Sequence, residues 1–225
     1  MESLNGFFFT FFNMDVAAQY APALARGALL TVATGAAVVV TGTALGIVLA
    51  ILRALQWRPL TLLIVAFADV LRSLPPLVIL IVLYFGLPEA GLPLSALFVT
   101  WFTLSLVLAA YAEESVWAGI SSLPAGQMEA ARSTGLSWWL AMRWVVLPQA
   151  VRRAVPTLTN RIISITKNTA LGSVVSLGEL LNAAQGASSL SGNPTPLMMA
   201  ALAYVVIFLP LVVFSRWLER NWVRG

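Results

Sequence analysis

The sequence predicts an all-α, polytopic membrane protein with about five transmembrane helices. Of its 225 residues, 60% are hydrophobic and only 10% are charged, whereas soluble domains average about 45–50% apolar and about 25% charged residues. The chain also contains uncharged stretches long enough to cross a bilayer, which takes roughly 20 apolar residues. These observations exclude a disordered chain, a coiled coil and an ordinary soluble enzyme.

Five candidate spans follow one another along the chain. The clearest is 27–52, with no charge over 26 residues; 90–112 is uncharged over 23 residues, and 197–214 is an apolar run of 18 residues. The second candidate, 59–87, and the fourth, 156–181, are interrupted. The interrupting residues are Asp69, Arg72, Pro75 and Pro76 in the second candidate, and Arg161, Lys167 and Glu179 in the fourth.

The distribution of basic residues orients these spans, because cytoplasmic loops carry an excess of Lys and Arg. The loops around 86–93 and 182–196 contain neither residue. The other two loops and the tail after the last span hold Arg53, Arg58, Arg132, Arg143, Arg152, Arg153, Arg216, Arg220 and Arg224. We therefore expect the N-terminus outside the cell and the C-terminus in the cytoplasm.

No repeat or linker divides the chain, so we expect one transmembrane domain over 1–225 with an external segment at 1–22. The phenylalanine-rich run at 7–12 lies between Glu2 and Asp15 and lacks the positive n-region and the cleavage site of a signal peptide. It is typical of an amphipathic stretch on the outer membrane face. Four tryptophans fall near predicted span ends, where aromatic belts form: Trp57, Trp101, Trp217 and Trp222.

Composition also excludes several chemistries. The chain has no Cys and no His, which removes disulfides, Cys/His zinc sites, haem attachment and imidazole catalysis. It contains neither a Walker A sequence nor a G-x-S-x-G nucleophile elbow. We therefore expect no enzyme activity, no catalytic residue, no bound cofactor and no metal site. The net charge of +4 favours membrane orientation over nucleic-acid binding.

The longest cytoplasmic segment, 121–153, is too polar to span the membrane and predicts a pair of short helices. Pro124 suits the first turn of a helix, and Gly135 suits the position just past a helix end. Ser137 can cap a second helix that ends near Pro148. Such a hairpin needs a surface outside the bilayer on which to dock; an amphipathic hairpin lying on lipid is the alternative.

The residues of this hairpin resemble a known motif. Positions 129–131 read Glu-Ala-Ala, Gly135 follows four residues later, Val145 ten residues after that, and 147–148 read Leu-Pro. This spacing resembles the "EAA" loop of ATP-binding-cassette (ABC) importer permeases.

Further matches are similar to the polar amino-acid permease subfamily. Segment 72–77 (RSLPPL) resembles the R-G-T-P-L-L segment of that subfamily, with Asp69 where a Glu is usual, and 110–114 (AYAEE) resembles its A-Y-x-A-E segment. Further matches follow the loop at Asn160, Lys167, Leu171, Glu179 and Leu180. The resemblance covers about 27–214, most of the chain.

The resemblance implies an assembly in the bacterial inner membrane. Two permease subunits, identical or homologous, would bind a cytoplasmic dimer of ABC ATPases that holds ATP and Mg²⁺, and an external solute-binding protein would deliver a polar amino acid. No nucleic acid is implied. The family's loop couples ATPase to permease, which implies coupling roles for Glu129, Ala130, Ala131, Gly135, Leu147 and Pro148. The alternative class is a secondary amino-acid transporter or channel without an ATPase.

The candidates for the substrate path are Arg72, Pro75, Glu113, Glu114, Asn160 and Lys167. Arg72, three residues from Asp69 on one helical face, either forms a structural ion pair or lines the path. Glu113 and Trp117 stand where the family more often has a small residue and an arginine, so we expect a preference for a cationic or zwitterionic amino acid. The alternative is that both glutamates pair with basic loop residues at the cytoplasmic end. Arg161 and Lys167 would attract the carboxylate of any amino acid.

Overall fold

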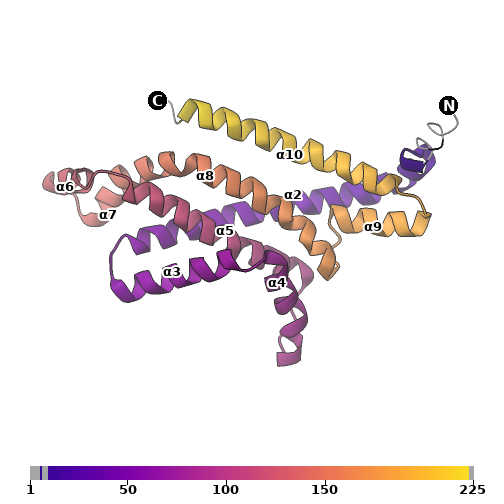
Figure 1. The fold of residues 1–225 in the computed structure, drawn as a ribbon, viewed down its shortest axis with the longest axis horizontal. Helices are drawn as coiled ribbons and strands as arrows, with labels where there is room; N and C mark the ends of the chain where they lie inside the picture. Colours follow the sequence, from indigo (N-terminus) through magenta and orange to yellow (C-terminus); the bar gives the residue numbers. More distant parts are fainter. Residues whose placement is uncertain (1–5, 7–9, 223–225) are drawn as a thin grey trace. The chain divides into compact units, whose positions relative to one another are not determined.

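The computed structural model describes the backbone of residues 6 and 10–222, and the side chains as far as Arg220. All regular elements within these residues are helices, which confirms the predicted all-α class. The α-helices, labelled as in Figure 1, are α2 (Met14–Arg53), α3 (Arg58–Ser73), α4 (Pro76–Ile81), α5 (Ala96–Ser121), α6 (Gly126–Ser133), α7 (Trp138–Ala141), α8 (Leu147–Lys167), α9 (Leu180–Ser191) and α10 (Thr195–Trp222). Shorter segments are the π-helices η1 (Val82–Gly86) and η3 (Met142–Val146) and the 3₁₀-helices η2 (Pro88–Ala90) and η4 (Asn168–Val175).

Among the described residues, three helices are long and apolar enough to cross a membrane: α2, α5 and α10. They contain the predicted spans at 27–52 and 197–214 and most of that at 90–112. α2 begins at Met14, inside the segment 1–22 that was expected to lie apart from the first span; alanine-rich sequence favours helix there. Of the phenylalanine-rich run at 7–12, residues 7–9 lie outside the described residues, as do Glu2 and Arg224.

The second predicted span, 59–87, is broken where its prolines lie. Helix α3 ends at Ser73, and Leu74 is extended, with φ −94° and ψ 134°. A proline disfavours helical geometry in the residue before it, and Pro75 has this effect on Leu74. Taken together with the helical turns of Pro76–Ala90, from which it is bent by 98°, α3 forms either a fourth, broken span or a re-entrant loop by length and composition.

The fourth predicted span, 156–181, is not one continuous helix. α8 begins earlier, at Leu147, and passes at Lys167 into the 3₁₀-helix η4. Ser176 then has a left-handed φ of +60°, and the Glu179 side chain caps α9. α8 carries charged and polar residues along its length, so it does not qualify as a span by length and composition.

The chain forms two compact units, each with its own core. The first comprises residues up to 37 with 77–103 and 166–211, and its core contains Leu24, Leu180, Ala184, Ala187 and Ala200, with a second cluster around Leu80, Val99 and Val175. The second comprises 38–76, 104–165 and the residues from 212 on, with Ala50, Val116 and Ala154 at its centre.

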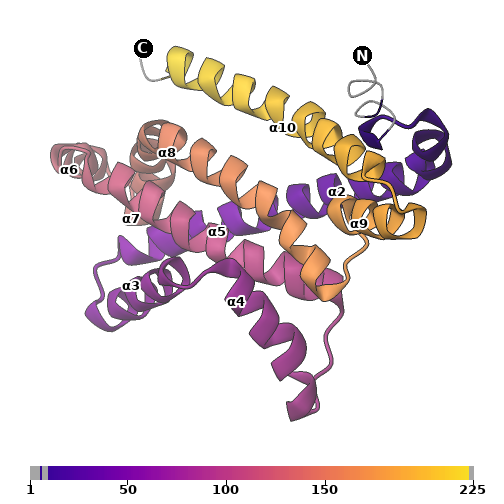
Figure 2. The ribbon, with the colours of Figure 1, turned by 45° about the vertical axis from the view of Figure 1, so that its right-hand side comes forward.

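The second unit holds most of the predicted functional residues. Its part of α2 packs closely against α5, because a Cβ added at Gly46 would lie 2.5 Å from the Cβ of Ala112 and 2.7 Å from the oxygen of Ala109. α3 runs back alongside the second half of α2 after a short turn (Figures 1 and 2). The hairpin of α6 and α7 follows α5 and leads through η3 into α8 (Figure 2).

Candidate functional site

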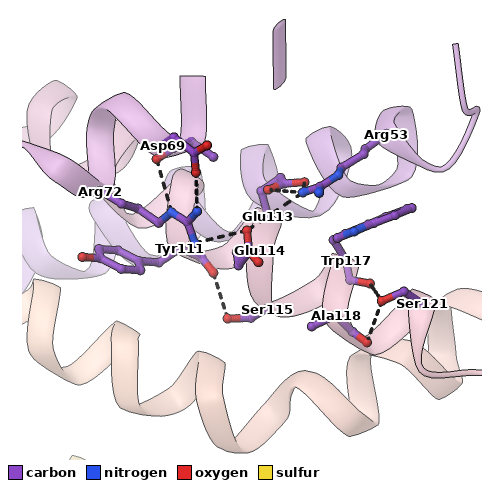
Figure 3. A network of polar contacts seen from close by, with 11 residues as sticks. Arg53, Asp69, Arg72, Tyr111, Glu113, Glu114, Ser115, Trp117, Ala118 and Ser121 are labelled. Atoms are coloured by element: carbon purple, nitrogen blue, oxygen red, sulfur yellow. Dashed lines mark hydrogen bonds and ion pairs between the residues drawn. The ribbon is translucent and has the colours of Figure 1, made fainter. Parts of the chain in front are cut away.

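A buried ion pair joins the end of α2 to α5 (Figure 3). Arg53 Nη1 lies 3.0 Å from Oε1 of Glu113, whose side chain is 0% exposed. The Arg53 guanidinium also lies over the Trp117 ring, 4.6 Å from its centroid. A carboxylate inside a membrane helix is costly unless it is paired. Glu113 is therefore held by Arg53, as the alternative hypothesis of pairing with basic residues expects.

Glu114, the next residue, meets a different cation. Arg72 Nη1 lies 3.1 Å from Glu114 Oε2, while Arg72 Nη2 lies 2.6 Å from Oδ1 of Asp69. Arg72 thus joins α3 to α5, and the predicted pair with Asp69 forms within α3 (Figure 3). Arg53 is more distant, with Nη1 3.9 Å from Glu114 Oε2. Glu114 is 44% exposed, so its carboxylate stays accessible to a solute.

Arg72 and Glu114 belong to a polar groove of about 550 Å³, within the size range of small-molecule sites. α5 and α8 supply its other lining residues, and Arg161 lies 4.5 Å from the ring centroid of Tyr111. From α5 the lining residues are Tyr111, Glu114, Ser115 and Ala118; from α8 they are Thr157, Asn160, Arg161 and Ser164. We call this set, with Arg72, the polar groove.

The structure divides the predicted path residues. Arg72, Glu114 and Asn160 line the polar groove, whereas Glu113 and Pro75 do not. Lys167 is exposed at the end of α8 and belongs to the other compact unit. The specificity that was expected of Glu113 therefore has no basis in its position, because its carboxylate is fully buried against Arg53.

Three hydroxyl residues of the groove were not predicted: Ser115, Thr157 and Ser164. A signal for them exists in the sequence. The groove residues of α5 lie at positions 111, 114, 115 and 118, and those of α8 at 157, 160, 161 and 164. Both sets repeat at i, i+3, i+4 and i+7, the spacing of one helical face. A search for polar stripes in the two helices would have found them.

The predicted loop forms the expected helix–turn–helix. α6 ends before Gly135, whose φ is +89°, a left-handed conformation that favours glycine. The Ser137 side chain accepts a hydrogen bond from the Leu140 backbone N–H at 3.4 Å and caps α7, as expected. The second helix does not end near Pro148. The wider π-turn of η3 precedes Pro148, so the missing proline N–H is accommodated and the helix continues as α8.

The six predicted coupling residues lie in different surroundings. Glu129, Ala130 and Gly135 are exposed, whereas Ala131 is only 7% exposed and faces into the protein. Leu147 packs against the core of Ala50, Val116 and Ala154, and Pro148 is exposed at the start of α8. The exposed members of the predicted set therefore lie on α6 and its turn, apart from Pro148 at the start of α8.

A groove of about 550 Å³ lies beside this surface. Glu129 and Arg132 of α6 line it together with Gln56 from the α2–α3 turn and Trp117 from α5. Trp117 also stacks on Arg53. The Trp117 side chain therefore contacts both the groove beside the hairpin and Arg53 of the buried ion pair.

Glu179, in the other unit, has a structural environment. Its carboxylate accepts hydrogen bonds from the backbone N–H groups of Leu181 and Asn182, at 3.0 and 2.7 Å, and from the Tyr204 hydroxyl at 2.9 Å. Its side chain is fully buried. Glu179 therefore caps α9 and joins it to α10, instead of facing a solute.

Comparison with known proteins gives consistent results. The family described as binding-protein-dependent transport system inner membrane component matches residues 42–224. GlnM of Bacillus subtilis (strain 168), a probable glutamine ABC transporter permease, is 36% identical over 178 residues, 79% of this chain and 82% of GlnM. The arginine transport system permease ArtQ of the same organism is 32% identical over 213 residues, 93% of this chain and 97% of ArtQ.

The fold is shared with solved transporters. A crystal structure of an amino acid ABC transporter with histidines superposes with a TM-score of 0.80 and 30% identity, covering 91% of this chain and 96% of that one. The family match removes the secondary-transporter alternative. The helical membrane fold and the hairpin after α5 agree with these similarities. The chain therefore belongs to the inner membrane components of binding-protein-dependent transport systems and is a permease subunit of an importer.

Proposed function

We propose that this permease carries a zwitterionic polar amino acid along the polar groove of α5 and α8. The observation that carries the proposal is the pairing of charges in the groove, where Arg72 and Arg161 accompany the accessible carboxylate of Glu114. The named functions of GlnM and ArtQ, which concern glutamine and arginine, support an amino acid as the solute.

The groove offers a partner for each charge that an amino acid carries. Arg161 makes no ion pair within the described residues and stacks on Tyr111, so its guanidinium can donate to an α-carboxylate. Glu114 can accept hydrogen bonds from an α-ammonium group. Ser115 and Ser164 add hydroxyl groups for a polar side chain. Among the described residues that line the groove, Glu114 is the one carboxylate, and Arg72 already engages it, so the lining favours a zwitterionic over a cationic solute.

The exposed surface of α6 is the docking site for a separate ATPase subunit. Glu129 offers a charged contact, and the small side chain of Ala130 permits close approach. ATP and Mg²⁺ are held by the ATPase dimer, and this chain binds no cofactor or metal. A second permease chain, identical or homologous, and an external solute-binding protein complete the importer. It lies in the inner membrane with the N-terminus outside and the C-terminus in the cytoplasm.

Co-purification tests the coupling part of the proposal. The tagged chain is isolated from native membranes in mild detergent, and its partners are identified by mass spectrometry. Gly135→Val forces a β-branched residue into a left-handed conformation, so recovery of the ATPase should fall. Gly186→Val in α9, outside the proposed docking surface, is the matched control, because a Cβ there meets nothing within 4 Å and the residue does not have a positive φ. Recovery of the chain without an ATPase would contradict the proposal.

Uptake into proteoliposomes tests the groove. Glu114→Gln removes a charge that would pair with the substrate ammonium, and charged hydrogen bonds contribute about 1.5–3 kcal/mol. The KM for a zwitterionic amino acid should therefore rise at least about tenfold. Glu89→Gln, an equivalent change in η2 remote in sequence from the groove, should leave the KM unchanged. An unchanged KM in Glu114→Gln would remove the groove from the substrate path.

A further inference from the structure

A separate cavity of about 460 Å³ lies where α2 ends and α3 begins. It is lined by Arg53, Gln56, Arg58, Thr61, Leu62 and Trp117. None of the predicted substrate-path or coupling residues lines it. It contains two arginines and no acidic residue, so its chemistry suits an anion.

Arg53 lines this cavity, but its guanidinium is largely engaged elsewhere. Its Nη1 is engaged by Glu113, and its guanidinium stacks on Trp117. Its Nε is buried and has no hydrogen-bond partner within the described residues. Because this Nε is shielded from solvent, it offers no donor to the cavity, and Arg53 contributes to the cavity wall only the part of its guanidinium charge that Glu113 does not neutralise.

Arg58 supplies the uncompensated charge. Its side chain is exposed and forms no ion pair or hydrogen bond with any residue that the structure describes. The first turn of α3 contains no acidic residue. Glu113 neutralises Arg53, and Glu114 is engaged by Arg72 at 3.1 Å. The cavity therefore keeps a net positive charge.

The apolar surface beside the cavity indicates where the anion comes from. Leu62 lines the cavity and is 70% exposed, as is Leu63 next to it on α3. Trp57, which directly precedes Arg58, is 63% exposed. In a membrane protein, tryptophan and arginine mark the headgroup level and exposed leucines face acyl chains. The cavity is thus continuous with a surface suited to lipid tails.

We propose that this cavity binds the headgroup of an anionic phospholipid. The exposed Arg58 guanidinium donates hydrogen bonds to the phosphodiester, and the acyl chains lie along Leu62 and Leu63. The lipid occupies the leaflet on the side of the α2–α3 turn. It contacts Arg53 and Trp117, which connect the hairpin groove to the buried ion pair. This site is distinct from the path of the transported solute.

Native mass spectrometry tests the proposal. The full chain is purified with its partner subunits, delipidated in detergent and titrated with phosphatidylglycerol or phosphatidylcholine at equal concentrations. The wild type should retain phosphatidylglycerol preferentially. Arg58→Gln should lower that occupancy about fivefold, the factor expected for one basic residue at an anionic surface. Arg152→Gln, which removes an exposed arginine from α8, is the matched control and should leave occupancy unchanged.

A second variant keeps both arginines. Leu62→Gln disrupts the apolar surface and should lower phosphatidylglycerol retention without changing the charge. Equal losses of phosphatidylglycerol occupancy in Arg58→Gln and Arg152→Gln would overturn the proposal, because they indicate diffuse surface charge. Displacement of the lipid by equimolar inorganic phosphate would also overturn it, because the site then binds a free anion. So would lipid retention by the isolated permease that disappears when the partner subunits bind, because a protein then occupies the site.

Discussion

The buried pair of Arg53 and Glu113 permits a prediction with a definite magnitude. The Glu113 carboxylate is 0% exposed and receives hydrogen bonds from Arg53 Nη1 at 3.0 and 3.3 Å. At this separation and an effective dielectric constant of about 20, the Coulomb energy is about 5 kcal/mol. Arg53→Met removes the cation but keeps an apolar stem, and leaves the carboxylate buried beside Glu114. Breaking a buried pair in this way costs about 3–5 kcal/mol.

The expected result is a loss of about 3–5 kcal/mol in the free energy of unfolding. Chemical denaturation of the purified permease in mixed micelles measures it. The double variant Arg53→Met/Glu113→Leu should recover most of the loss, because replacing both charges with apolar groups is often neutral. Arg152→Gln, an exposed arginine, should stay within about 0.5 kcal/mol of the wild type. A loss below about 1 kcal/mol in Arg53→Met, or a double variant no more stable than the single one, would refute the reasoning.

Three further changes test the packing and the ion pairs. Gly46→Ala places a Cβ 2.5 Å from an alanine Cβ on α5 and should cost about 1–3 kcal/mol in the same denaturation assay, whereas Gly126→Ala, which meets nothing within 4 Å, should cost little; equal effects would contradict close helix packing. Tyr204→Phe removes a hydroxyl that donates to the buried Glu179 carboxylate at 2.9 Å and should cost about 1–3 kcal/mol; a neutral result would mean that this hydrogen bond does not stabilise the fold. Asp69→Asn should change the free energy of unfolding by less than about 1 kcal/mol, because its carboxylate is 59% exposed; a larger loss would make the pair a structural requirement.

The hydropathy of the sequence located α2, α5 and α10 well, because each of these helices contains a long stretch without charged residues. It failed for 156–181. The helix there begins at Leu147, just ahead of Pro148, where the second helix of the hairpin was expected to end, and the π-turn η3 accommodates that proline. Such a local widening of the helix has no hydropathy signal. The break after Ser73, in contrast, was predictable, because Pro75 disfavours helical geometry at Leu74 and Pro76 suits the first position of the new helix α4.

The hairpin was predicted closely because its signals are local. Gly135 needs a left-handed φ, and Ser137 needs only the N–H three residues ahead. The roles within it were less accessible from sequence. Ala131 lies in the same motif as Ala130 but is buried, whereas Ala130 is exposed. Which face of so short a helix packs inward depends on η3 and α7, and no sequence motif states that.

Glu113 and Glu114 show why adjacent residues of one type need separate treatment. Successive residues on an α-helix are rotated by about 100°, so the two carboxylates have different principal partners, although Arg53 Nη1 also lies 3.9 Å from Glu114 Oε2. The first points to Arg53 and is fully buried, and the second meets Arg72 at the polar groove. A departure from the family pattern at Glu113 therefore adds no negative charge to the groove, because Arg53 neutralises it. Trp117 stands where the family usually has an arginine. Its uncharged ring lets the Arg53 guanidinium stack on it, 4.6 Å from the ring centroid, where an arginine would place a second cation beside Arg53. Both departures thus contact Arg53 inside the protein, and on the proposed function the groove residues Glu114, Arg72 and Arg161 would set the selectivity for a solute.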